Sequence, residues 1–515
     1  MVVVIFKSPS NSRYSRSIVL SVLCLVLFIT FLDTTIVSVA LGEIQLDLHA
    51  GVAQLQWMVN GYTLPFASLM LLAGNLADQF GRKKLLIIGL TVFATGGLIS
   101  ALASNPDILI AGRFVMGIGA AASEPGTLSI IRHTYSEHDQ RAKAFGIWAA
   151  IAGLALALGP VIGGILLGVG SWRYIFWFNV VVALLLVITS YKILPESSDR
   201  SDFRPDFLGF IIGSISLATI TFAIIMGESY GYANSLVIAL FCLSFISLAI
   251  FIFLERKNQN PMLAVRYFRD PAFSGALFSG FALFFSIFAI FFFTALYLEE
   301  VLNYSGYKIA TDFLPMTFMM VLSSIFTGKL ITRFGSALPM TLGSLVSAIG
   351  IFLSMLALGE NVPAGWLPWA LALAGVGFGS TLVPTVLIAL DRVPPEKSSM
   401  AASSVNTSRE LGSVIGVAVL GSMVNGNLSG YLVNRLNVLK IPSIFQVLVI
   451  HAIETGNIPK NLNNEEGVYG SIVNKVINAA YAAFREGLHN ALLLATLIIL
   501  LSAFISYSTI RRGKR

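Results

Sequence analysis

Charged residues are scarce in this 515-residue chain: they make up 11% of it, whereas hydrophobic residues reach 56%. A soluble domain carries about 25% charged residues, so this composition excludes a soluble protein. Cysteine is almost absent. Cys24 and Cys242 both stand inside apolar runs, which gives no disulfide framework and no metal-ligand spacing. The composition therefore predicts a membrane protein.

Histidine is scarce as well, and no phosphate-binding P-loop is present. The five histidines stand apart, in or near predicted loops or the ends of apolar segments, so they indicate no catalytic or metal site. Without a P-loop, direct coupling to ATP is not expected. We therefore expect neither an enzyme nor a cofactor.

The net charge of +7 does not indicate a nucleic-acid partner. Basic residues stand singly or in short clusters between apolar blocks, and they form neither a basic stripe nor a recognition module. The first apolar run, at 17–41, follows basic residues as in a signal peptide. It exceeds the roughly 7–15 apolar residues of such a peptide, so we expect an uncleaved membrane span.

A helix needs about 20 apolar residues to cross a bilayer, and fourteen segments meet this condition. They are residues 17–41, 55–77, 84–103, 107–131, 143–168, 174–194, 207–227, 233–254, 273–298, 308–331, 337–358, 365–390, 399–425 and 487–510. The sequence therefore predicts an all-α polytopic membrane protein. The seventh and eighth segments are the least clearly separated, near residues 227–234.

The distribution of lysine and arginine predicts the orientation. With the N-terminus inside, the cytoplasmic segments hold 24 of the 33 basic residues, and the short outer loops hold only Arg173 and Lys308. The long segment 426–486 carries little weight in such a count. We therefore expect a multi-pass protein of a cell membrane, in bacteria the inner membrane, with both termini cytoplasmic.

Two segments 254 residues apart are similar. Gly74–Gly81 reads GNLADQFG and Gly328–Gly335 reads GKLITRFG, each at the predicted cytoplasmic end of a span. Repeated halves are typical of carriers that bind substrate between two bundles and expose it alternately to each side. Chance recurrence of glycine-rich turns is the alternative.

The segment Gly74–Lys84 resembles the signature loop of the major facilitator superfamily. Three further segments narrow the resemblance to its fourteen-span drug:proton antiporters. They are Leu32–Ala40 in the first span, Ile110–Gly119 in the fourth, and Gly153–Gly164 in the fifth, which matches the antiporter motif. With Trp172–Asn179 and Ser403–Gly416 included, the resemblance covers nearly the whole chain.

The resemblance implies the major facilitator fold: two six-helix bundles, with two extra helices between them. The domains would be residues 1–194, 195–272 and 273–515, with a long outer loop at 426–486. Asp78 would meet the positive N-terminal end of the helix that begins near Ser399. The implied cytoplasmic gate comprises Gly74, Asp78, Gly81, Arg82 and Arg409.

The fifth span is rich in glycine, which permits close backbone approach and a bend. Its motif residues are Gly153, Gly159, Pro160, Gly163 and Gly164. In the family this motif is associated with export and is generally absent from symporters. A tightly packed helix between the halves would limit proton leak; ordinary packing of small residues is the alternative.

Ionisable residues inside the predicted spans include Asp33, Arg113, Glu124, Arg409 and Glu410. A charge at mid-bilayer costs a few kcal/mol, so each needs a partner or a purpose. At a rise of about 1.5 Å per residue, Asp33 and Arg113 lie at similar depths. The resemblance implies that both take part in proton coupling, and a static structural ion pair is the alternative.

Glu124 stands before Pro125, at a position where the family usually has an apolar residue. It can carry a proton, face a cationic substrate, pair with Arg409 across a closed cytoplasmic side, or extend toward the membrane interface. We include it among the proton-coupling residues. The candidates for a substrate pocket are Glu124, Trp57, Tyr62, Phe66 and Asp312.

The predicted function is proton-driven export of lipophilic or amphipathic compounds such as drugs, some of them cationic, by alternating access. The expected partners are the small-molecule substrate, protons and membrane lipid, and we expect a monomer. The alternatives are a dedicated exporter of one native metabolite, lipid or antibiotic, a transporter-like sensor, and an uptake symporter. The antiporter motif argues against the symporter.

Overall fold

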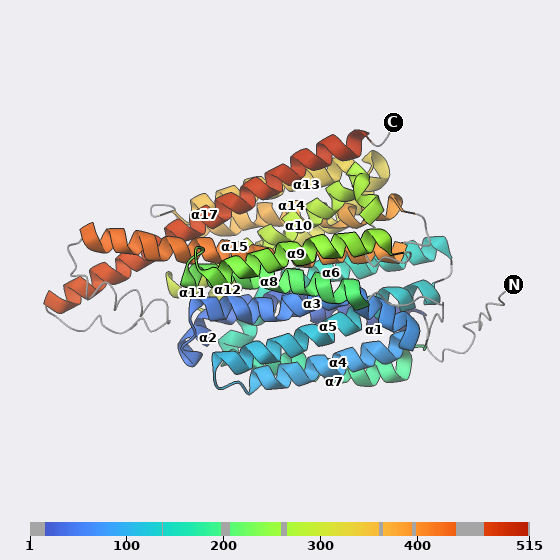
Figure 1. The fold of residues 1–515 in the computed structure, drawn as a ribbon, viewed down its shortest axis with the longest axis horizontal. Helices are drawn as coiled ribbons and strands as arrows, with labels where there is room; N and C mark the ends of the chain where they lie inside the picture. The colour runs from blue at the N-terminus through green and yellow to red at the C-terminus, as the bar shows by residue number, and fades with distance from the viewer. Residues whose placement is uncertain are drawn as a thin grey trace.

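A computed structural model describes residues 16–135, 137–196, 207–258, 265–359, 364–393, 398–438 and 468–512. Every regular element in these ranges is a helix, and the long helices lie side by side along the long axis of the molecule (Figure 1). This confirms the all-α prediction. The start of α1 and the end of α17 lie at the same end of the bundle, which we call the proximal end; α2 and α11 lie at the opposite, distal end.

The first part of the chain forms α1 (Arg16–Ile36), η1 (Val37–Ala40), α2 (Leu41–Leu48), α3 (Val52–Phe80), α4 (Arg82–Ala101), α5 (Pro106–Thr134), α6 (His138–Val169) and α7 (Arg173–Ile193). The middle forms α8 (Phe207–Tyr230) and α9 (Ser235–Lys257). The last part forms η2 (Val265–Arg269), α10 (Pro271–Phe288), η3 (Ala289–Thr294), α11 (Ala295–Glu300), α12 (Gly306–Phe334), α13 (Ala337–Ala357), η4 (Ala364–Trp366), α14 (Leu367–Asp391), α15 (Ser398–Val438) and α17 (Val468–Arg512).

Each of the fourteen predicted spans coincides with one of these helical segments. Within the described ranges, eleven helices are long and apolar enough to cross a membrane. The other three predicted spans correspond to α3, α8 and α15. Helices α3 and α15 pack against each other and bury polar side chains, which lowers their apolar content. The uncertain boundary near residue 230 is resolved, because Asn234 caps the separate helix α9.

Helical structure extends beyond two of the predicted spans. The first span, predicted over 17–41, lies within the candidate membrane span Arg16–Leu48, in which a 3-10 turn joins α1 to α2. The predicted outer loop 426–486 is helical at both ends, because α15 continues to Val438 and α17 begins at Val468. A helix satisfies its own backbone hydrogen bonds, so it can continue beyond the last residue of its apolar segment. The centre of this loop lies outside the described residues.

The predicted repeat extends to backbone geometry. Helices α3 and α12 correspond end to end at a spacing of 254 residues. Each ends at a glycine with positive φ, Gly81 at 107° and Gly335 at 77°. The non-glycine residues with positive φ, His49 at 53° and Asn303 at 52°, are related by the same spacing. Such residues are uncommon, so the recurrence supports two structurally repeated halves, α1–α7 and α10–α17.

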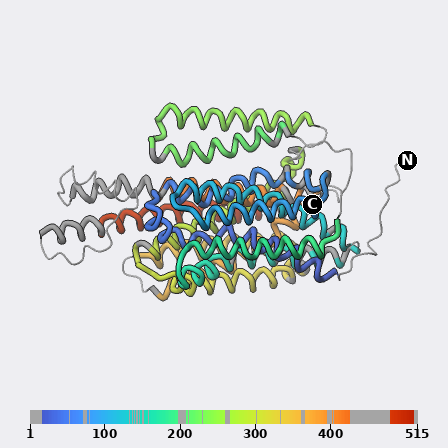
Figure 2. The backbone as a smooth tube through the Cα atoms, turned by 90° about the horizontal axis from the view of Figure 1, so that it is seen from below, coloured from blue at the N-terminus to red at the C-terminus, as the bar shows by residue number. Residues whose placement is uncertain are grey.

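Helices α8 and α9 form a hairpin at one edge of the bundle (Figure 2). Helix α8 packs against α3 of the first half and α15 of the second. The ring centroids of Trp57 and Phe222 are 4.3 Å apart, and Leu217 packs with Leu64 and Val414. The hairpin therefore covers the seam between α3 and α15.

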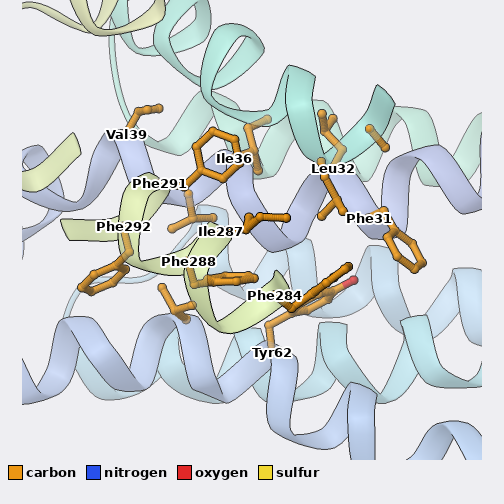
Figure 3. Packing of buried hydrophobic residues seen from close by; sticks show 14 of the residues in the cluster. Phe31, Leu32, Ile36, Val39, Tyr62, Phe284, Ile287, Phe288, Phe291 and Phe292 are labelled. Atoms are coloured by element: carbon orange, nitrogen blue, oxygen red, sulfur yellow. The ribbon is translucent and has the colours of Figure 1, made fainter. Parts of the chain in front are cut away.

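The apolar core continues between the two halves. Figure 3 shows the phenylalanine-rich α10 and η3 packed against α1 and α3, with Phe284 beside Tyr62 and Phe291 beside Ile36. These four side chains are at most 1% exposed. Aromatic and aliphatic side chains therefore fill the region where the halves meet, and the buried ionisable groups lie in apolar surroundings.

Candidate functional site

Asp33 lies at the centre of a buried polar cluster between α1, α5 and α7. Its carboxylate forms an ion pair with Arg113 and accepts a hydrogen bond from the amide of Asn179. Asp33, Arg113 and Asn179 are all 0% exposed. An isolated charge in apolar surroundings is very costly, so this pairing explains how the bundle accommodates both ions. The predicted proximity of Asp33 and Arg113 is confirmed.

Neighbouring groups fix the orientation of Arg113. Its Nε donates to the carbonyl of Met58 at 2.8 Å, and its guanidinium carbon lies 4.6 Å from the ring centre of Tyr62. The Tyr62 hydroxyl donates to the carbonyl of Thr30 at 2.7 Å. These contacts come from α1 and α3. A change in the charge of Asp33 would therefore alter the contacts that join α1, α3 and α5 in one half.

Asn179 was missed as a site residue by sequence reasoning. It enters the sequence analysis only as the last residue of the segment Trp172–Asn179. The available signal was an amide inside an otherwise apolar span, since a buried polar side chain needs a partner. Its Nδ2 finds Asp33, while its buried Oδ1 has no hydrogen-bond partner.

A second buried cluster joins the two halves nearer the proximal end. Asn406 of α15 donates to Oε1 of Glu124 of α5 at 3.4 Å and accepts from Nη1 of Arg409 at 3.5 Å. The other terminal nitrogen of Arg409 donates to Oγ1 of Thr385 at 2.7 Å and to the carbonyl of Leu382 at 2.8 Å. In this structure the Asn406 amide therefore bridges Glu124 and Arg409, which were expected as one possibility to pair directly.

The charges of this second cluster do not balance. Glu410, adjacent to Arg409 in sequence, is 1% exposed and accepts a hydrogen bond from Ser413 at 3.4 Å. Glu124 is also 1% exposed. Within this cluster two carboxyl groups share one guanidinium, so Arg409 can compensate only one negative charge. The remaining carboxyl group has to be neutral or to meet a further cation.

The pocket candidates lie in different surroundings. Tyr62 and Phe66 are buried next to each other, with ring centroids 5.6 Å apart, beside the Asp33 cluster. Trp57 instead lies against Phe222 of the α8–α9 hairpin. Asp312 is buried in α12 and pairs with Lys308, one turn earlier, at 2.6 Å. The structure therefore gathers Tyr62, Phe66 and Asp33 and separates Trp57 and Asp312 from them.

The predicted cytoplasmic gate is described only in part. The surroundings of Gly74 and the side chain of Asp78 are not among the described parts of the chain, so the proposed contact of Asp78 with α15 stays a prediction. Gly81 forms the turn between α3 and α4 with a φ that L side chains rarely adopt. Arg82 begins α4. Arg409, also assigned to this gate, belongs to the buried cluster around Asn406.

The antiporter motif lies between the two halves, as predicted. Its glycines face several helices: a Cβ at Gly159 would lie 2.9 Å from both Ile36 N and Thr35 Cβ of α1, and one at Gly164 would lie 2.8 Å from Ala310 Cβ of α12. Gly163 packs against Ile36 and Val39, and Gly153 faces Leu382 of α14. Pro160 is buried within α6. Helix α6 is therefore in contact with both halves through positions that have no room for a side chain.

Gly159→Ala is expected to lower the free energy of unfolding by about 1–3 kcal/mol, because overpacking displaces backbone that cannot rotate away. Thermal unfolding of the purified variant in detergent measures the effect. Gly328→Ala is a matched control, since nothing lies within 4 Å of its added Cβ. Equal melting temperatures for the two variants would contradict the tight packing of α6 against α1.

Two repeated helical halves, joined around buried ionisable groups, define a multi-pass membrane carrier. The sequence profile of the Major Facilitator Superfamily matches residues 23–417. The methylenomycin A resistance protein of Bacillus subtilis (strain 168) is 31% identical over 413 residues, covering 80% of this chain and 88% of that protein. The chain therefore belongs to the Major Facilitator Superfamily.

Other relatives extend the similarity over almost the full length. The multidrug efflux pump LfrA of Mycolicibacterium smegmatis (strain ATCC 700084 / mc(2)155) is 26% identical over 513 residues, covering 98% of this chain and 99% of that one. The multidrug resistance protein Stp of Mycobacterium tuberculosis (strain ATCC 25618 / H37Rv) is 30% identical over 476 residues, or 91% and 87% of the two chains.

A solved structure supports the fold. A bacterial homologue of the human lysosomal transporter Spinster, in an inward-facing and unoccupied conformation, superimposes with a TM-score of 0.64 at 18% sequence identity. The match covers 97% of this chain and 98% of that one. At this identity the similarity shows the fold alone, and it agrees with the predicted major facilitator architecture.

Proposed function

We propose that this protein is a proton-coupled antiporter that exports lipophilic or amphipathic compounds, including drugs, across a cell membrane. The observation that carries the proposal is the fully buried Asp33–Arg113–Asn179 cluster within one half of a two-bundle carrier. Several relatives are named as resistance or efflux proteins, which favours export over uptake. No cofactor enters the scheme, because the proton gradient supplies the energy.

Asp33 is the proposed proton carrier of the first half. When its carboxylate is ionised, the pairing with Arg113 and Asn179 holds α1, α5 and α7 together. Protonation removes the negative charge and weakens the ion pair, leaving Arg113 held by Met58 and Tyr62. A proton therefore changes which contacts are favourable, and this biases the carrier toward one of its two orientations.

The second cluster is the proposed site at which the protein recognises the charge of a bound compound. Glu124 and Glu410 together carry one more potential negative charge than Arg409 can compensate. A proton on one carboxyl group restores the balance, and so does a cationic group of a bound compound. Because Glu124 and Asn406 belong to opposite halves, occupancy of this region also alters how the halves meet.

Glu124→Gln is expected to reduce transport of ethidium, a permanent cation, by about tenfold, which corresponds to ~1.4 kcal/mol. Transport of the neutral dye Nile red should change much less. Both are measured as fluorescence changes in inverted membrane vesicles. The exposed Glu137, substituted by Gln, is the control for the loss of one carboxyl group. Equal losses for the two dyes would contradict a role in recognising charge.

The experiment that tests the proposal itself is uptake of ethidium into inverted vesicles under an imposed proton gradient. Uptake should require the gradient, should cease when nigericin collapses it, and should move protons in the opposite direction. Transport that is indifferent to the gradient would contradict proton coupling, even though the fold and family would stand.

A dedicated exporter of one compound is the second candidate. It is favoured by the methylenomycin A resistance protein of Bacillus subtilis, a relative whose name gives a single antibiotic. A panel of structurally unrelated compounds, tested for thermal stabilisation of the purified protein, separates the two. Stabilisation by one chemical class indicates a dedicated exporter, and stabilisation by several indicates a broad substrate range.

The remaining features of the proposal concern location and assembly. We propose a cell-membrane protein, the bacterial inner membrane being the expected location, with both termini cytoplasmic and a monomer as the functional unit. The proximal end would then face the cytoplasm and the distal end the outside. The shared position of the start of α1 and the end of α17 agrees with an even number of crossings.

A further inference from the structure

The short helix α2 begins against a carboxylate from the other half of the molecule. Glu299 of α11 accepts two backbone hydrogen bonds, from Glu43 N to Oε1 at 2.9 Å and from Gly42 N to Oε2 at 3.1 Å. These amides belong to the first turn of α2, which spans Leu41–Leu48. Glu299 therefore supplies partners for amides that have none within the helix itself.

The two sides of this contact are far apart in sequence, by 256 and 257 residues. Helix α2 continues from α1 in the first half, and α11 follows α10 in the second. Both lie at the distal end of the bundle, opposite the termini (Figure 1). The contact therefore joins the two halves at the end that the scheme above assigns to the outside.

The chemistry of the contact favours a particular alignment. A carboxylate at the start of a helix is stabilised by the helix dipole as well as by its hydrogen bonds. Accepting from two successive amides with both oxygens requires α2 and α11 to be correctly oriented. The apolar packing of nearby η1 against η3 has no such directional requirement. Relative movement of the halves at this end has to break the Glu299 contact.

Neighbouring charges on α2 act within one half only. Oε1 of Glu43 accepts from Trp172 N at 3.4 Å, and Asp47 pairs with Arg173 at 2.7 Å. Both partners stand at the start of α7, so these contacts tie α2 to its own bundle. Helix α2 is thereby fixed to the first half and presents its N-terminal amides to the second.

We propose that Glu299 is a gating residue of the transport cycle: its carboxylate fastens the N-terminus of α2 and holds the distal ends of the two halves together. The contact forms when the distal side closes and breaks when it opens. It was not indicated by any sequence motif. The inference rests on the proposed alternating-access cycle, but its test requires neither a proton gradient nor a known substrate.

The test measures how often the distal side opens. Val39 is 0% exposed and lies in η1, which packs against η3 of the other half; Figure 3 shows it near Phe291. A cysteine is introduced by Val39→Cys after Cys24→Ser and Cys242→Ser. Its modification by a charged methanethiosulfonate is timed in nanodiscs, where both sides are accessible and orientation does not matter.

Glu299→Gln should accelerate this modification by roughly 5- to 30-fold, the effect of a charge-assisted contact of this kind on a two-state equilibrium. Glutamine has one acceptor oxygen, and its amide group faces a donor. Glu299→Asp keeps the charge but is one methylene shorter, so it should give an intermediate rate and remains informative if the glutamine variant folds poorly.

The matched control is Glu43→Gln, which removes the charge of a carboxylate in the first turn of α2. The side chain of Glu43 accepts from Trp172 N, a hydrogen bond that stays within one half. This control should leave the modification rate within about twofold of the parent, a change of only ~0.4 kcal/mol. Acceleration by Glu299→Gln but not by Glu43→Gln supports the proposal. Equal rates for the parent and Glu299→Gln, or equal acceleration by both variants, would overturn it. Failure of the proposed proton coupling would show separately: the parent would transport ethidium regardless of the proton gradient, while the modification rates stayed as expected here.

Discussion

Asp33→Asn is expected to abolish proton-coupled export while leaving membrane insertion intact. Asparagine has nearly the same shape as aspartate and can still contact Asn179 and Arg113. Arg113 loses its counter-charge but keeps the Met58 carbonyl and the Tyr62 ring, so the protein should fold with a lower melting temperature. In the proposed cycle the charge of Asp33 determines the strength of its ion pair with Arg113. Asparagine carries no titratable proton, so the proton gradient cannot change this contact.

Ethidium movement in inverted vesicles, with the internal pH recorded alongside, measures this loss. The control is Asp107→Asn, the same chemical change at an exposed residue in the first turn of α5, which should transport at the parental rate. Expression and the melting temperature of the purified protein show whether Asp33→Asn is folded. Undiminished pH-driven export by this variant would remove Asp33 from the mechanism.

Arg113→Met is expected to destabilise the protein by ~3–5 kcal/mol, the cost of leaving a buried charge without its partner. Methionine has a comparable volume but offers no positive charge to Asp33 and no donor to the Met58 carbonyl. Because Asp33 is 0% exposed, solvent cannot replace the lost guanidinium. This is the largest stability effect that we expect from a single substitution in the described part of the chain.

The double variant Asp33→Asn with Arg113→Met distinguishes charge from packing. It removes both ions, so most of the lost stability should return, while transport stays absent. Thermal unfolding of the two single variants and the double variant gives the coupling between the residues directly. If Arg113→Met alone were as stable as the parent, or if the double variant showed no recovery, the pair would not be the stabilising contact described here.

Much of the first cluster was predictable because its members obey simple constraints. Charges inside apolar helices need partners, and the helix rise places Asp33 and Arg113 at similar depths, although they are 80 residues apart. The same reasoning could not select Asn179, 146 residues from Asp33. A lone amide does not reveal from sequence which of several neighbouring helices it faces.

Predictions that required knowing which way a side chain points succeeded less often. Trp57 and Tyr62 stand five positions apart on α3, yet one contacts the extra hairpin and the other the Arg113 guanidinium. The sequence likewise could not show that Asn406, one turn before Arg409, lies between Arg409 and Glu124. The rotation of each helix about its axis is set by packing with its neighbours.

The sequence by itself determined the membrane class, the helical architecture and the superfamily, because hydrophobicity over about 20 residues and a few glycine-rich turns are local properties of the chain. The tertiary structure alone decided that Asn179 binds Asp33, that Asn406 bridges the halves, and that Glu299 holds the start of α2. These contacts join residues between 146 and 282 positions apart. Which of them form depends on how each helix is rotated and how the two bundles meet, and close packing of the whole assembly fixes both.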